Sequence, residues 1–139
     1  MLKFKTIIMV LLALPLVVAA GEYKKEIEVL NSMTAIMNEF ADRMENATEV
    51  SEYITACDEL ADGIEKHGAG LVALYGEHPD WSEEPPAEVK EPLTRHMEAS
   101  KRYEKALQKA VKYANNNMDN EDFQASFKRL NKAIYEMYQ

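Results

Sequence analysis

Two histidines, His67 and His96, are the side chains of this 139-residue sequence best placed to bind a ligand. Both lie on or beside the apolar stripes of predicted helices, and antiparallel pairing of those helices would put them at about the same height, near Tyr135 and Tyr138. Two neutral imidazoles at one height could ligate iron, copper or zinc. In the plainer interpretation, each histidine lies half-exposed at the margin of a helix contact, hydrogen-bonded to a tyrosine or a carboxylate. We therefore name both as candidate cofactor ligands and assign no metal site.

Methionine is the other soft donor in the sequence. The methionines after residue 20 are Met33, Met37, Met44, Met97, Met118 and Met137, and most of them fall on or beside the apolar stripes of the predicted helices. Flexible thioether side chains usually fill gaps in a core. The alternative is that a methionine here binds haem iron or copper.

No motif for enzymatic chemistry is present. The sequence has no glycine-rich phosphate loop, no Cys-x-x-Cys pair, no His-Glu-x-x-His and no Cys-x-x-Cys-His for covalent haem attachment. The Glu-x-x-His pairs of di-iron carboxylate bundles are also missing. Ser100 lies one helical turn from His96, which is more typical of a polar gap in a helix contact than of a nucleophile and its base. We therefore predict that the protein is not an enzyme and name no catalytic residue.

Four amphipathic helices are predicted to position these side chains, over residues 22–45, 48–75, 88–115 and 120–138. In each, apolar residues recur at alternating steps of four and three, as in packed helices. The clearest stripe, in the second helix, is Val50, Ile54, Cys57, Ala61, Ile64, Gly68, Leu71 and Tyr75. Short first and third connections favour antiparallel neighbours. The predicted fold class is all-α: residues 21–139 form an up-down-up-down antiparallel four-helix bundle.

The connections give further expectations. Asn46 or Thr48 is expected to cap the second helix, and Asp119 or Asn120 the fourth. Residues 76–87 include Gly76 and three prolines, which predicts an end to the second helix at Gly76 and then an irregular loop. Trp81, the sole tryptophan, lies in this loop. It is either a binding aromatic on an exposed loop or part of a lid over the open end of the bundle.

Residues 1–20 have the pattern of a signal peptide that is cleaved before Gly21. Lys3 and Lys5 precede an uncharged apolar run of residues 6–20, and Val18 and Ala20 are small residues suited to a cleavage site. The run is shorter than the roughly 20 residues that a membrane-spanning helix needs. We therefore predict export to the periplasm or the medium, with no stable membrane insertion after cleavage.

The charge and the cysteine content limit the partners. The formal net charge is −8, and removal of residues 1–20 takes away two lysines and no acid, leaving −10. Such an acidic chain is a poor partner for nucleic acid. Cys57 is the only cysteine, so an intramolecular disulfide is excluded. Its place on the apolar stripe predicts burial, and the alternative is a disulfide-linked homodimer.

The layout of the mature chain resembles the soluble periplasmic four-helix b-type cytochromes. The similar stretches are Asn46-Ala47-Thr48-Glu49-Val50 at the first turn and Ala133-Ile134-Tyr135-Glu136-Met137-Tyr138 near the end. That family binds haem with a methionine early in the first helix and a histidine near the end of the fourth. The resemblance implies Met33 as the match to the methionine, whereas Tyr135 lies where the histidine would be. It allows haem as a cofactor, while the residues by themselves imply none.

These observations favour a small, exported, acidic helical bundle of the cell envelope. The predicted function is a non-enzymatic binding or interaction module for an unidentified protein or small ligand. The alternative is a haem- or metal-binding periplasmic carrier like the cytochromes that the chain resembles.

Overall fold

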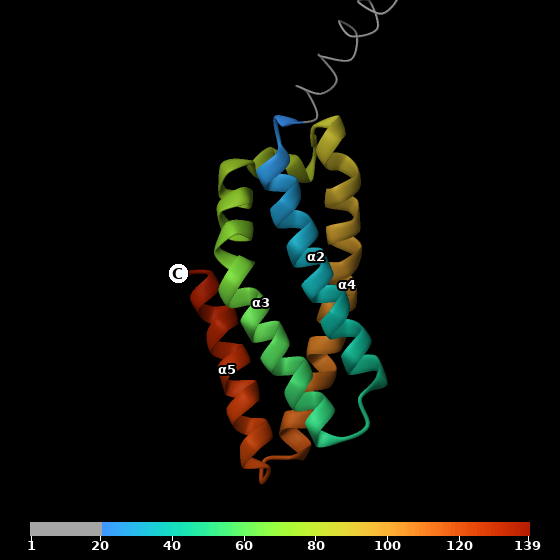
Figure 1. Ribbon diagram of the computed structural model, residues 1–139, viewed down its shortest axis with the longest axis vertical. Helices are drawn as coiled ribbons and strands as arrows, with labels where there is room; N and C mark the ends of the chain where they lie inside the picture. The colour runs from blue at the N-terminus through green and yellow to red at the C-terminus, as the bar shows by residue number, and fades with distance from the viewer. Residues whose placement is uncertain (1–20) are drawn as a thin grey trace, which may run out of the picture.

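The computed structural model describes residues 21–139 and confirms the predicted all-α, up-down-up-down bundle (Figure 1). Its α-helices are α2 (Lys24–Asn46), α3 (Val50–Glu77), α4 (Ala87–Asn116) and α5 (Glu121–Met137), and a short 3-10 helix, η1 (Pro79–Ser82), lies between α3 and α4. The predicted signal peptide, residues 1–20, lies outside the described residues. Among residues 21–139, no helix combines the length and the apolar composition needed to cross a membrane.

Three local expectations need correction. Neither Asn46 nor Thr48 caps α3: Asn46 is the last residue of α2, and Glu49 is the N-cap, in a reciprocal capping box with Glu52. α3 also continues past Gly76 to Glu77. The predicted irregular loop contains η1, because a proline at the first position of a helix has a suitable φ and no N–H to leave unpaired. The expected cap of α5 is confirmed, since the Phe123 amide donates to Asn120 Oδ1 at 2.9 Å.

The largest helix contacts join neighbours that run in the same direction. α2 and α4 lie side by side, with Thr34 next to His96 and with Lys109 Nζ donating to the Met44 carbonyl. The two pairs are separated by 62 and 65 residues in the sequence. A nearly constant separation means that the two helices run in the same direction. α3 and α5 are likewise parallel neighbours, as the hydrogen bond from Ser126 to Asp58 shows near the start of α5.

Only α2 and α3 form an extensive antiparallel contact in the described chain. Gly63 lies against Ile36 and Gly70 against Val29, so the residue numbers rise along one helix as they fall along the other. α4 and α5 touch slightly, and residues 78–86 carry the chain across the end of the bundle from α3 to α4. The spatial order is therefore α4, α2, α3, α5, with α3 and α4 at opposite corners.

The core has two separate parts. The larger cluster joins all four α-helices and includes the buried side chains Phe40, Met44, Cys57, Leu60, Ile64, Ala110, Phe123 and Leu130. The smaller cluster closes the end of the bundle where α2 and α4 begin, and consists of Leu30, Leu74, Trp81, Val89 and Leu93. Trp81 is only 3% exposed and stacks on His78 with ring centroids 3.9 Å apart. The connection after α3 is thus a lid rather than an exposed binding loop.

Candidate functional site

A cavity of about 230 Å³ lies between the two parts of the core. α5 has 17 residues, whereas α3 has 28 and α4 has 30. Figure 1 shows that α5 ends partway along α3, and its last residue, Met137, lies against Gly68 of α3. Leu60 and Ile64 of the larger cluster and Ile134 of α5 line the cavity on one side, and Leu71 of α3 lines it near the lid. The cavity therefore lies beside the last turn of α5, between that turn and the lid.

Methionines form much of the cavity wall. Met33 and Met37 come from α2, Met97 from α4 and Met137 from the last turn of α5. Met33 and Met37 are buried, while Met97 is 52% exposed. Met137 lies against Gly68 of α3, where a Cβ atom would come within 2.7 Å of the Met137 sulfur. The absence of a side chain at Gly68 thus gives Met137 its place beside the cavity.

His96 is the titratable imidazole of this cavity and is only 4% exposed. Its Nδ1 lies 3.4 Å from Thr34 Oγ1, and the ring is also hydrogen-bonded to the backbone of Leu30, one turn earlier on α2. Burial lowers the pKa of His96, and the bond to Leu30 opposes this only in part. The imidazole is therefore neutral at pH 7 and is held in place from α2.

Hydroxyl groups supply the remaining polar atoms of the wall. Ser100 lies one turn after His96 on α4, and Tyr75, Tyr103 and Tyr138 also line the cavity. Burial raises the pKa of Tyr103 to about 12 and raises that of Tyr75, so both are neutral phenols at physiological pH. No carboxylate, ammonium or guanidinium group lines this space within residues 21–139. The cavity can accept and donate hydrogen bonds but has no fixed charge.

The structure brings together two of the three candidate ligands predicted from the sequence. Met33 and His96 both line the cavity, whereas His67 is partly exposed on α3 and does not. The predicted heights of His67 and His96 along the bundle are nearly right. Thr34 lies beside His96, and the α2–α3 contacts put Thr34 level with about residue 65, close to His67. However, the α3 residues that line this cavity are Leu60, Ile64, Leu71 and Tyr75, and His67 is not among them.

Sequence reasoning did not find Ser100 or Tyr103 as part of a site. A usable signal was present, since the predicted fourth helix is much shorter than the second and the third. Unequal helices cannot all face a partner along their full length. The difference in length indicates the height above which apolar residues of the longer helices have no contact with the fourth helix.

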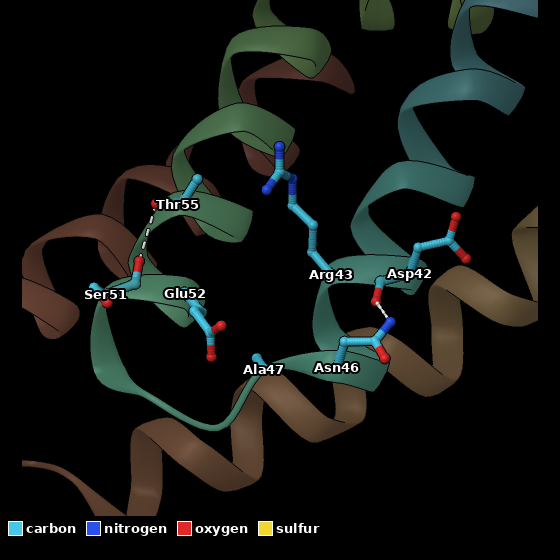
Figure 2. A pocket seen from close by; sticks show the side chains of 7 residues that line it. All are labelled: Asp42, Arg43, Asn46, Ala47, Ser51, Glu52 and Thr55. Carbon is cyan, nitrogen blue, oxygen red and sulfur yellow. Dashed lines mark hydrogen bonds between the residues drawn. The ribbon is translucent and has the colours of Figure 1, made fainter.

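A second, wider hollow of about 400 Å³ lies at the turn between α2 and α3 (Figure 2). It is open to solvent, and its charged side chains Asp42, Arg43 and Glu52 already have partners. These partners are Arg102 for Asp42, Glu39 and Glu59 for Arg43, and the amides of Thr48 and Glu49 for Glu52. A ligand here would compete with existing ion pairs and with the α3 cap, so we favour the cavity of about 230 Å³ as the site.

Comparison with models of known protein families, with curated proteins and with solved structures found no match to this chain.

Proposed function

We propose that this protein is a non-enzymatic binding protein of the cell envelope that holds a small ligand in the cavity at the end of α5. The observation that carries the proposal is a partly open, mainly apolar space with a few polar groups in its wall. Binding sites for small molecules have this composition, with polar groups that fix orientation. At about 230 Å³ the cavity is smaller than the roughly 300–1,000 Å³ of most ligand pockets, so the ligand should contain few heavy atoms.

The arrangement favours binding over catalysis. Ser100 and His96 share the cavity, but the contacts of the His96 ring on α2 are the Thr34 hydroxyl and the Leu30 backbone. A base that activates a serine is normally oriented by a carboxylate, and none lines this space in the described chain. The neutral His96 imidazole can instead exchange a hydrogen bond with a ligand.

The test is binding of a small apolar probe, benzene, to protein labelled with ¹³C at the methionine methyl groups. We expect benzene to shift the Met33 and Met37 methyl signals and to leave Met118, which lies at the α4–α5 turn, unchanged. Ser100→Leu should fill part of the cavity and abolish these shifts. The matched control is Ser51→Leu, which makes the same change in the open hollow at the α2–α3 turn and should leave the shifts intact.

Two results would overturn this proposal. One is the absence of any benzene-induced shift at Met33 and Met37. The other is a Ser100→Leu protein that is folded by circular dichroism and still shows the wild-type shifts. In either case the cavity does not receive ligands.

A haem- or metal-binding carrier is the second candidate, and one observation favours it. Met33 and His96, a thioether and an imidazole from two different helices, line the same cavity. At about 230 Å³ the cavity is smaller than most ligand pockets, so a macrocycle such as haem would have to move the helices apart or remain partly exposed. Titration of the apo protein with haem, followed by its absorbance in the Soret region, tests this candidate, and His96→Ala and His67→Ala serve as the paired variants.

A further inference from the structure

The methionines are unevenly distributed over the molecule. Residues 21–139 contain six methionines, and four of them line the cavity at the end of α5. The other two lie elsewhere: Met44 is fully buried in the larger core cluster, and Met118 is 75% exposed at the α4–α5 turn. Methionines that only fill gaps in a core would not need to gather from three helices around one open space.

The donor atoms at the cavity are all neutral, and apart from the hydroxyl oxygens they are soft or borderline. Thioether sulfur is polarisable and favours Cu(I) among the biological metals, whereas Ca²⁺ and Mg²⁺ require several oxygen ligands. The wall contains thioethers, the His96 imidazole and hydroxyls, but no carboxylate or thiolate among the described residues. A divalent ion would therefore keep most of its charge unneutralised in an apolar space, which is costly. A soft monovalent ion suits this donor set better.

His96 is held as metal-binding histidines usually are. Such a histidine normally uses one ring nitrogen for the metal and the other for a hydrogen bond that fixes the ring. Here Thr34 Oγ1 lies 3.4 Å from Nδ1, and the ring is also hydrogen-bonded to the Leu30 backbone, one turn earlier on α2. Because Nδ1 already contacts Thr34, a ligand in the cavity would bind through Nε2.

Access for an ion is also provided. Met97 is half-exposed on α4 beside the buried Met33 and Met37, and its unbranched side chain has three rotatable bonds. An ion can therefore meet one thioether at the surface before it reaches the two buried ones.

We propose that this cavity binds one soft monovalent metal ion, Cu(I), through the thioethers of Met33 and Met37 and the imidazole of His96. The proposal rests on the binding function proposed above and specifies its ligand. Binding requires no change in oxidation state and releases no proton, because the donor groups are neutral before the ion arrives.

The experiment uses Ag(I), a redox-inert probe for Cu(I) sites, with the ¹³C-methyl-methionine protein. One equivalent of Ag(I) should shift the methyl signals of Met33 and Met37 and the ring signals of His96, while Met44 and Met118 remain unchanged. Cu(I) affinity is then measured by competition with a chromophoric Cu(I) chelator. The double variant Met33→Leu/Met37→Leu keeps the side-chain volume and should weaken binding at least about tenfold. Met44→Leu is the matched control in the core and should bind as wild type does.

Cys57 is the other soft donor, and its contribution is tested separately. It is fully buried in the larger cluster and does not line the cavity. Cys57→Ser should therefore retain wild-type Cu(I) affinity. A loss of affinity in Cys57→Ser with none in Met33→Leu/Met37→Leu would assign the metal to the thiol and overturn the proposal.

The remaining outcomes separate the two proposals. If benzene shifts the Met33 signal and Ag(I) does not, the cavity binds ligands but the metal proposal is wrong. If neither probe shifts it, both proposals fail. If the double variant does not fold, the Ag(I)-induced shifts of the wild-type protein provide the test. Shifts at Met44 and Met118 as large as those at Met33 and Met37 would mean non-specific binding and would refute a site at His96.

Discussion

Alanine substitution at three glycines of α3 should change stability in different directions, although the helical environment is the same. Gly63, Gly68 and Gly70 all have φ values that any L-residue adopts, so the backbone does not require glycine. Each substitution should gain about 1 kcal/mol of helix propensity. What differs is the neighbour that the new methyl group would meet.

The contact distances set the expected magnitudes. At Gly70, the new Cβ would lie 3.4 Å from Val29 Cγ2, an ordinary contact, so Gly70→Ala should stabilise the protein by about 0.5–1 kcal/mol. At Gly63, it would lie 2.8 Å from both Ile36 Cδ1 and Ile36 Cγ2. A β-branched side chain in a helix has essentially one χ1 rotamer, and overpacking costs about 1–3 kcal/mol. Gly63→Ala should therefore lose about 1 kcal/mol net, which places the two variants about 2 kcal/mol apart.

Gly68→Ala should fall between the other two variants. Its Cβ would come within 2.7 Å of the Met137 sulfur, but Met137 is unbranched and can move. Urea unfolding followed by circular dichroism provides the measurement. With a urea m-value of about 2 kcal/mol/M, the midpoints of Gly70→Ala and Gly63→Ala should differ by about 1 M. Equal stabilisation by both substitutions would show that α2 and α3 are not packed as closely as described here, and the reasoning would fail.

Three further predictions concern single side chains. Burial, with a smaller contribution from Asp58, raises the pKa of the Cys57 thiol to about 12. At pH 8 the native protein should therefore react with a thiol reagent at least about a hundredfold more slowly than the urea-unfolded protein. It should also run as a monomer without reductant. Trp81→Ala should lower the free energy of unfolding in urea by about 3–5 kcal/mol, because the ring is only 3% exposed. Trp81 is the sole tryptophan, so blue-shifted fluorescence of the native protein checks its burial. Emission typical of a tryptophan in water would contradict this burial. Burial lowers the pKa of His96 below its usual value of 6.5, so the unfolded chain binds a proton at this residue more readily than the folded protein does. The contribution of His96 to the free energy of unfolding is complete above about pH 6.5 and is lost as the pH falls below that value. The slope is at most about 1.4 kcal/mol per pH unit. His96→Gln should reduce the loss of stability between pH 7 and pH 5, and an unchanged pH profile would contradict the neutral, buried imidazole.

The apolar stripes predicted which faces of the helices are inside. Cys57, Ala61, Ile64 and Gly68 of the α3 stripe are all buried, as the four-three spacing requires. Tyr75 belongs to the same stripe but is 40% exposed. The reason is that α5 ends at Met137, so Tyr75 lies at a height where that neighbour is absent. Periodicity identifies the apolar face of a helix but does not show how far along that face a partner extends.

The order of the helices in space could not be predicted from the pattern. Short connections do make α2 and α3 antiparallel neighbours, as expected. The connection of residues 78–86 is long enough to cross the end of the bundle, and it places α4 next to α2 instead of α3. Contacts between partly exposed charged groups, such as that of Arg102 with Asp42, accompany this arrangement. They are too common on helix surfaces to specify neighbours from sequence alone.

The candidate site depends on which residues of each helix reach the cavity. α3 reaches it through Leu60, Ile64, Leu71 and Tyr75, and His67 is not among these lining residues, so the two histidines named from the sequence do not share a site. Met137, the last residue of α5, lies against Gly68, and Leu71 and Tyr75 come later along α3 than this contact. Because α4 packs on α2, His96 lies beside Thr34 and lines the same space as Met33 and Met37. The packing order of the helices and the length of α5 therefore decide which residues of the apolar stripes line the cavity.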